Sequence, residues 1–312
     1  MSNTYLVTGG MGCIGTWVLY HLVQQGKKVV AFDISEDRHR WDWLMSQEEQ
    51  SQITFVKGDL TDYEQVKAVF DTQDISHVIH LGALQVPMCR ANPVLGSQVN
   101  VTGTVNIFEA ATQSNLKHVA YASSIAVYGP AGDYPAGLIA HDAQKAPRTL
   151  YGAYKVCNER TAQIYYNDNG LSSTALRPYT VYGVGRDQGL TSEPTTAMLA
   201  AAKGQDCTIT FGGKMQFHYA SDVALQFIAA AEQVADNAEV FNMGTPPIAV
   251  QTVADIIMKI KPNVTIKVEE NILPFPEGFD ATAMNAHFET VYETALEAGI
   301  EATIAHLEKL GI

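Results

Sequence analysis

The chain has 312 residues, of which 46% are hydrophobic and 17% charged, a composition typical of one large globular domain or two smaller ones. Its formal net charge is −13, and no run of lysines and arginines interrupts the acidic balance. Because nucleic acids and anionic membranes attract proteins through basic patches, the charge excludes both as partners. Neither a signal peptide nor a membrane span is recognisable, so we expect a cytoplasmic protein.

The four cysteines give no sign of a metal site or a disulfide framework. Cys13, Cys89, Cys157 and Cys207 lie far apart and form no CxxC pair. This spacing fits a reducing cytoplasm, and we expect no bound metal.

Short β-rich runs alternate with helical patterns over the first 180 residues. Strands are predicted at residues 4–8, 28–33, 53–57, 77–81, 118–123 and 172–177. Helices are predicted at residues 14–25, 62–72, 97–114 and 150–169. Apolar strands separated by helices indicate parallel βαβ units. The predicted fold class is therefore α/β, with a Rossmann-type doubly wound parallel sheet.

The alternation loosens after residue 180, where Pro, Gly and Thr become frequent. Helices are predicted at residues 195–203, 221–235, 250–260 and 300–310, and strands at 207–211, 239–243 and 264–268. We expect residues 1–180 to form the Rossmann domain, with residues 216–243 returning to it. Residues 181–312 are expected to form a smaller α/β domain.

A glycine pattern links the first strand to the first helix. Gly9, Gly12 and Gly15 have the spacing G-x-x-G-x-x-G. Glycines here permit a tight turn and close approach of a pyrophosphate, whose charge the helix N-terminus stabilises. The same pattern is compatible with a simple tight turn, so it needs support from its surroundings.

That support comes from an acidic residue at the end of the second strand. Asp33 lies 18 residues after Gly15, where a carboxylate accepts hydrogen bonds from the ribose hydroxyls of NAD and repels the 2′-phosphate of NADP. Arg38 and Arg40 are close enough to hold such a phosphate, but we interpret them as solvated helix charges. Asp59, after the third strand, is either an adenine contact or a helix N-cap.

A tyrosine and a lysine lie one helical turn apart in "YGAYK". Tyr151 and Lys155 therefore share a helix face. A neighbouring ammonium stabilises a phenolate and lowers the pKa of the tyrosine toward the range of a general base. Ser123 and Ser124 follow the fifth strand, at the sheet edge where ligands bind in open α/β folds.

Together these motifs resemble the short-chain dehydrogenase/reductase superfamily. The sequences "YASSIAVYG" and "LRPYTVYG" resemble its extended branch, the NAD-dependent epimerase/dehydratase family, and the resemblance covers about residues 1–245. It implies NAD as cofactor, a substrate-binding role for residues 181–312, and a homodimer formed through the helices near 97–114 and 150–169.

The resemblance also implies roles for individual residues. Tyr151 would be the general acid/base, Lys155 would bind the nicotinamide ribose and lower the tyrosine pKa, and Ser124 would bind the reacting oxygen. Cofactor contacts are expected from Gly9, Gly12, Cys13, Ile14, Gly15, Asp33, Asp59, Leu60, Leu81, Gly82, Ala83, Asn100, Ser123, Tyr151, Lys155, Pro178 and Val181.

The chain departs from relatives that act on nucleotide-linked sugars. Many of these carry an asparagine at the position of Thr180 and an arginine at the position of Met215, and this chain has no arginine after Arg186. A buried diphosphate without a guanidinium partner would be poorly compensated, although Lys203 or Lys214 offers a substitute.

A smaller carbohydrate-like substrate is therefore favoured, such as a free sugar, a sugar acid or a polyol. Substrate contacts are expected from Gln85, Ser124, Tyr179, Arg186 and His218, with Arg90 and Arg148 as further polar side chains near the predicted pocket. An arginine among them suits a carboxylate, but the same side chains equally suit the tying down of loops.

The sequence is compatible with three alternative functions. The first is an NAD-dependent dehydrogenase that oxidises a secondary alcohol of a carbohydrate-like substrate. The second is a nucleotide-sugar 4-epimerase or dehydratase that retains its NAD. The third is a non-catalytic NAD-binding sensor, which the complete set of Ser124, Tyr151 and Lys155 disfavours.

Overall fold

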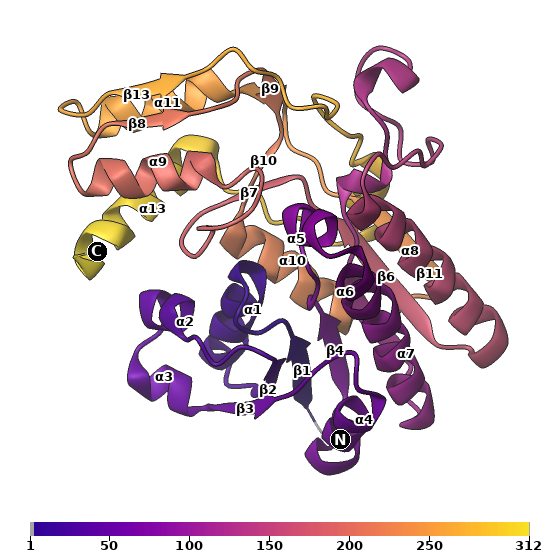
Figure 1. Ribbon diagram of the computed structural model, residues 1–312. Helices are drawn as coiled ribbons and strands as arrows, with labels where there is room; N and C mark the ends of the chain where they lie inside the picture. The colour runs from indigo at the N-terminus through magenta and orange to yellow at the C-terminus, as the bar shows by residue number, and fades with distance from the viewer. Residues whose placement is uncertain (1–2, 312) are drawn as a thin grey trace.

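The computed structural model describes residues 3–311 (Figure 1). Within them, seven parallel strands form one sheet in the order β11-β6-β5-β4-β1-β2-β3. The strands are β1 (Thr4–Thr8), β2 (Lys28–Asp33), β3 (Ile53–Lys57), β4 (His77–His80), β5 (His118–Ala122), β6 (Ser172–Arg177) and β11 (Ala238–Asn242). The predicted α/β class with a Rossmann-type parallel sheet is confirmed.

The order of the strands reverses between β1 and β4. From β1 the chain continues to β2 and β3 on one side, and β4, β5 and β6 then extend the sheet on the other. The connections diverge at this point, so a crevice opens beyond the carboxyl ends of the strands. Ligands of open α/β sheets bind in such a crevice.

Helices cover both faces of the sheet, as expected for strands with two apolar faces. On one face α1 (Cys13–Gln24) packs against α10 (Ala220–Glu232). On the other face α4 (Tyr63–Gln73), α7 (Gly103–Gln113) and α8 (Leu150–Asn169) pack together. Separate apolar clusters fill the two layers, with Leu19 and Phe227 in the first and Val69 and Phe108 in the second.

Helix α8 has local signals at both ends. The Thr149 hydroxyl accepts a hydrogen bond from the Gly152 amide, and Gly170 ends the helix in the left-handed conformation. The predicted bounds, residues 150–169, match the structure. This cap fixes the first turn of the helix, which carries Tyr151.

The predicted helix over residues 97–114 is interrupted. A π-helical turn, Gln98–Thr102, precedes α7 and leaves Asn100 buried. Two short helices that sequence periodicity did not reveal, α5 (Val86–Ala91) and α6 (Pro93–Ser97), lie just before it. This irregular segment is adjacent to the crevice, where π-turns are frequent.

The C-terminal part has its own apolar cluster, which includes Phe211, Ile257 and Ile304. Three two-stranded sheets pair β10 with β7, β12 with β9, and β13 with β8. Their bounds are β7 (Thr180–Tyr182), β8 (Cys207–Ile209), β9 (Lys214–Met215), β10 (Phe217–Tyr219), β12 (Ile248–Ala249) and β13 (Ile266–Val268). The remaining helices are α2 (His39–Leu44), α3 (Gln47–Ser51), α9 (Glu193–Ala202), α11 (Val250–Ile260), α12 (Thr282–His287) and α13 (Leu296–Leu310).

Residues 3–311 include no helix that is both long and apolar enough to cross a membrane. The four cysteines are free thiols. Across the same residues, no three His, Cys, Asp or Glu side chains gather into an arrangement that could hold a metal ion.

Candidate active site

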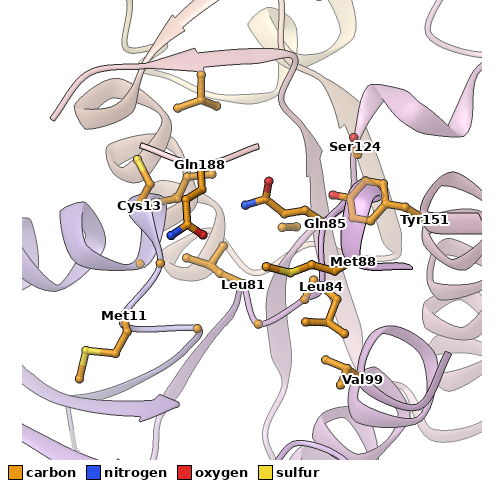
Figure 2. Close-up of a pocket in the computed structure, with 18 of the residues that line it drawn as sticks. Met11, Cys13, Leu81, Leu84, Gln85, Met88, Val99, Ser124, Tyr151 and Gln188 are labelled. Carbon is orange, nitrogen blue, oxygen red and sulfur yellow. The ribbon is translucent and has the colours of Figure 1, made fainter. Parts of the chain in front are cut away.

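A cavity of about 590 Å³ opens at the carboxyl edge of the sheet, between the sheet and the C-terminal part (Figure 2). Most residues proposed from the sequence line it. They are Gly9, Gly12, Cys13, Ile14, Gly15, Asp33, Asp59, Leu60, Leu81, Gly82, Ala83, Gln85, Ser123, Ser124, Tyr151, Lys155, Pro178, Tyr179, Val181 and Arg186. The volume lies within the usual range for ligand and cofactor sites.

The glycine loop forms the cofactor end of this cavity. Gly9 has φ +70°, a value that favours glycine, and a Cβ at Gly15 would collide with the Gly9 carbonyl oxygen. Gly12 precedes α1, and no side chain of residues 3–311 caps the first turn of that helix. The N–H groups of Cys13 and Ile14 are therefore available to a phosphate at the helix N-terminus.

Asp33 lies at the edge of the cavity with its carboxylate held by two backbone amides. Met11 N–H donates to Oδ2 and Ser35 N–H donates to Oδ1, both at 2.9 Å. Each oxygen keeps a further lone pair, so the carboxylate can also accept hydrogen bonds from ribose hydroxyls. Its negative charge is fixed next to the glycine loop.

Of the two arginines after β2, only Arg40 differs from the interpretation as a solvated helix charge. Arg40 is mostly buried, and its guanidinium donates to the Asp187 carboxylate at 2.6 Å and to the Met11 carbonyl at 2.9 Å. Arg38 is exposed, but its guanidinium lies 5.2 Å from the ring centre of Trp41. Arg40 was therefore misinterpreted, because its ion-pair partner comes from a distant loop that local sequence does not reveal.

Asp59 lines the cavity, and a different residue caps the following helix. Its side chain accepts a hydrogen bond from the Thr61 amide at 2.8 Å. The N-cap of α4 is Asp62, whose carboxylate accepts from the amides of Glu64 and Gln65. The structure thus excludes the interpretation of Asp59 as a helix N-cap.

Ser124, Tyr151 and Lys155 meet at the centre of the cavity. Ser124 lies beside Tyr151 and lowers the pKa of its hydroxyl, and the Lys155 ammonium lies 5.6 Å from the centre of the tyrosine ring. Lys155 Nζ also donates to the Ala122 carbonyl at 2.5 Å. Figure 2 shows the Tyr151 hydroxyl pointing into the cavity, with Ser124 beside the tyrosine ring.

Burial has the largest effect on the pKa values of Tyr151 and Lys155. Desolvation raises the pKa of Tyr151 above its ordinary value, opposed by the Ser124 hydrogen bond and by the positive charge of Arg186. Burial also lowers the pKa of Lys155 to about 8. Within the protein alone, Ser124 and Arg186 therefore favour the phenolate, a role that the sequence assigned to Lys155.

Ser123 lies in the wall of the cavity and belongs to a buried polar network. Its hydroxyl donates to Glu159 at 2.6 Å, and Arg177 binds both oxygens of the same carboxylate at 2.7 Å. Arg177 also donates to the Tyr128 hydroxyl at 2.9 Å. The network fixes the strand ends behind Ser124.

Asn100 does not line the cavity, although a cofactor contact was expected from it. Its side chain accepts from the Leu84 amide at 2.7 Å and donates to the Leu84 carbonyl at 2.9 Å. Asn158 in turn donates to the Asn100 carbonyl. Asn100 therefore supports the loop after β4, whose residues Leu81, Gly82 and Ala83 do line the cavity.

The Arg186 guanidinium lines the cavity without an acidic partner among residues 3–311. The one polar contact of its side chain with these residues is a weak one, with the Thr191 hydroxyl at 3.5 Å, and its buried Nε has no partner there. A buried guanidinium nitrogen without a partner is unfavourable unless a ligand supplies one. The arrangement therefore suits an anionic group of a bound molecule.

His218 lies outside the main cavity. It lines a small second cavity, and burial lowers the pKa of its ring to about 4. The two remaining arginines of the sequence proposal are on the surface, where Arg148 pairs with Asp133 at 2.7 Å and Arg90 is exposed. The substrate contact expected from His218 has no support in this position.

Several lining residues escaped the sequence interpretation, among them Gln188, Thr191 and Phe275. Gln188 and Thr191 follow Arg186, and Phe275 comes from the proline-rich loop after β13. None belongs to a motif. The sequence signals were the run of Pro, Gly and Thr after residue 180 and the proline-rich stretch 273–278, which indicate loops but not where they lie.

A comparison with known protein families gives the cavity its chemical context. The model of the NAD dependent epimerase/dehydratase family matches residues 5–244. The chain belongs to this family. The resemblance seen in the sequence is thereby confirmed, and NAD is the cofactor of the family.

Individual relatives of this family carry different activities. UDP-glucuronate 4-epimerase 2 of Arabidopsis thaliana is 29% identical, over 90% of this chain and 69% of its own length. UDP-glucose 4-epimerase of Thermotoga maritima has a TM-score of 0.85 at 21% identity, covering 99% of this chain and 100% of that one. L-threonine dehydrogenase of Clostridium difficile has a TM-score of 0.86 at 21% identity, covering 100% and 99%. The two solved structures share the fold.

The cavity fits NAD at both ends of the expected site. The uncapped first turn of α1 offers N–H groups to the diphosphate, and Asp33 offers acceptors to the adenosine ribose. Lys155 lies beside Tyr151 at the opposite end, where an ammonium can bind the second ribose. When bound, NAD supplies the acceptor for a hydride.

Proposed function

We propose that the protein is an NAD-dependent dehydrogenase that oxidises a secondary alcohol of a free carbohydrate-like substrate, with a sugar acid favoured over a neutral sugar or polyol. The proposal depends mainly on the charges that line the cavity. Of its arginine and lysine side chains, Arg40 is paired with Asp187 and Lys155 lies beside Tyr151. Arg186 remains for a substrate.

One unpaired guanidinium suits one carboxylate, which it binds through two parallel hydrogen bonds. A nucleotide diphosphate carries at least two negative charges and would be left partly uncompensated. The same conclusion is supported by the two positions at which many nucleotide-sugar relatives carry an asparagine and an arginine. Thr180 and Met215 are buried, contact each other at 3.1 Å and do not line the cavity.

The chemistry follows from the positions of Ser124 and Tyr151. A substrate hydroxyl between them would give its proton to the Tyr151 oxygen while hydride leaves the same carbon. The Ser124 hydroxyl would donate a hydrogen bond to the reacting oxygen. Arg186 would hold the carboxylate, which fixes the reacting carbon in the cavity and provides much of the rate through alignment.

A screen for NADH formation tests this function. Purified protein with NAD would be offered free sugars, uronic acids, aldonic acids, polyols and UDP-sugars. We expect net NADH from one of the sugar acids, and none from the Tyr151→Phe variant. Activity confined to UDP-sugars would overturn the proposed substrate class.

The second candidate function is a nucleotide-sugar 4-epimerase that keeps NAD bound. It is favoured by the 29% identity to UDP-glucuronate 4-epimerase 2, whose named substrate carries both a diphosphate and a carboxylate. The same Ser124, Tyr151 and Lys155 would serve it. Conversion of UDP-glucuronate without net NADH would identify this function.

A homodimer is proposed through the helices near residues 97–114 and 150–169, which include α7 and α8, as the family resemblance implies. Exposed apolar side chains support it, with Ile164 and Leu150 of α8 at 56% and 44% exposure and Val94 of the adjacent α6 at 67%. Light scattering of the purified protein would show twice the chain mass. A monomer at micromolar concentration would contradict the proposal.

A further inference from the structure

The loop between β7 and α9, residues 183–190, is here called the strap. Its first part is fastened to elements that bind the cofactor. Trp17 Nε1 of α1 donates to the Val184 carbonyl at 2.9 Å, and Arg40 Nε of α2 donates to the Gly185 carbonyl at 3.0 Å. A loop from the C-terminal part thus lies against the first and second helices of the sheet.

Ion pairs strengthen this attachment at Asp187. Arg40 donates to Asp187 Oδ1 from Nη2 at 2.6 Å and from Nε at 2.9 Å, and His39 Nε2 lies 2.8 Å from Oδ2. The side chains of Asp187 and Arg40 are 21% and 14% exposed, so water competes weakly for these contacts. Asp187 therefore joins the strap to both residues at the start of α2.

The attachment continues into the glycine loop. Arg40 Nη1 donates to the Met11 carbonyl, and the Met11 amide donates to Asp33. A line of direct contacts therefore runs from Asp187 through Arg40 and Met11 to the carboxylate expected to bind the adenosine ribose. The strap is anchored to the part of the chain that surrounds bound NAD.

The other end of the strap reaches the opposite wall of the cavity. A Cβ at Gly189 would collide with the side-chain oxygen of Gln85, in the loop after β4. Between the two walls, Gln188 lines the cavity together with Cys13 and Leu81, and Figure 2 draws its amide between these two residues. The strap therefore crosses the cavity and presents an amide to the groove of the dinucleotide.

We propose that the strap closes over bound NAD and that Asp187, through Arg40, sets how fast the dinucleotide leaves. Asp187 and Arg40 act as positioning residues, whereas Gln188 is the side chain that faces the cofactor. A dinucleotide between α1 and the strap leaves only when the strap moves, and that movement breaks the contacts of Asp187. Loop opening of this kind limits turnover in many enzymes.

The inference rests on NAD as the cofactor and does not depend on the substrate. It is tested by the dissociation of NADH, followed by fluorescence after mixing the complex with excess NAD. We expect Asp187→Asn to release NADH about tenfold faster, with a smaller change in the association rate. An unchanged dissociation rate would overturn the proposal.

A double-mutant cycle shows whether Asp187 acts through Arg40. Arg40→Met should accelerate release as Asp187→Asn does, and the double variant should be no faster than the faster single variant. Additive effects would contradict the coupling. Arg40→Lys keeps the positive charge and should release NADH more slowly than Arg40→Met. It replaces Arg40→Met in the cycle if that variant is unstable.

The control is an ion pair of similar length on the surface. Glu297 pairs with Lys259 at 2.7 Å, outside the cavity lining, so Glu297→Gln should leave NADH release unchanged. Thermal unfolding without nucleotide should differ little among the variants. If the control accelerates release as strongly, or if release follows unfolding temperature alone, Asp187 has no specific role. If the substrate screen fails but Asp187→Asn still accelerates NADH release, only the proposed dehydrogenase function is refuted.

Discussion

The half of the cavity proposed for the cofactor and the half proposed for the substrate, here called the cofactor half and the substrate half, are built in different ways. The cofactor half takes its glycine loop and Asp33 from a short continuous stretch at the start of the chain. The substrate half collects Gln85, Tyr151, Arg186 and Phe275 from segments far apart in the sequence. A local stretch builds the first half, whereas the second depends on how distant segments meet. Substitutions in the two halves should therefore have separable effects.

The largest effect is expected where the two halves meet, at Tyr151. Tyr151→Phe removes the proton acceptor and should lower kcat for alcohol oxidation roughly 10²–10⁴-fold. Because the ring and the neighbouring Lys155 remain, NADH should still bind, as titration of its fluorescence would show. Full turnover by this variant would exclude Tyr151 as the base.

Arg186 belongs to the substrate half. Arg186→Gln should lower kcat/KM for an acidic substrate by about 10–100-fold, mainly through KM, because a charged hydrogen-bond partner is lost. NADH affinity should change little. Arg148→Gln is the matched control, since Arg148 pairs with Asp133 on the surface. Equal losses in the two variants, or losses on acidic and neutral substrates alike, would contradict a carboxylate contact.

Asp33 belongs to the cofactor half. Asp33→Ala should reduce the preference for NAD over NADP by about tenfold, because it removes both the ribose acceptor and the charge that repels a 2′-phosphate. Substrate KM should stay nearly constant. Asp71→Ala on α4 is a suitable control, because Asp71 pairs with Lys67 outside the cavity lining. Tighter binding of NADP than NAD by the unmodified protein would remove the basis of this prediction.

The smallest effect concerns the pH dependence of oxidation. Oxidation needs the Tyr151 phenolate, and burial raises the pKa of this residue, so the rate should rise toward alkaline pH. The Ser124 hydrogen bond lowers that pKa; Ser124→Ala should therefore move the rising limb to higher pH by up to about one unit. A pH–rate profile measures the shift. A limb that moves to lower pH would contradict the assignment.

Local signals explain why much of the sheet and the cofactor half was predictable. Strands β1, β2 and β6 match the predicted ranges because their apolar runs are buried between two layers of helices. The edge strand β3 also matches, although only its Ile53 is buried. Helix α8 matches because Thr149 caps it and Gly170 ends it. Where a residue's partner is near in sequence, the pattern contains the information.

The remaining features depend on contacts that no local pattern encodes. In the sequence Arg40 resembles a surface charge, but in the structure it pairs with Asp187 of the strap. Asn100 was expected to touch the cofactor, but the π-helical turn directs its amide to Leu84 instead. His218 was expected to contact the substrate, but it lines a separate small cavity. In each case tertiary packing decides the role.

The stoichiometry of NADH formation tests the central claim most directly. With the best substrate of the screen, the protein and excess NAD, released NADH and consumed substrate are measured in the same samples. The proposed dehydrogenase forms one NADH for each substrate molecule oxidised. Complete conversion of a UDP-sugar to its epimer without accumulation of NADH would contradict the account and identify an epimerase.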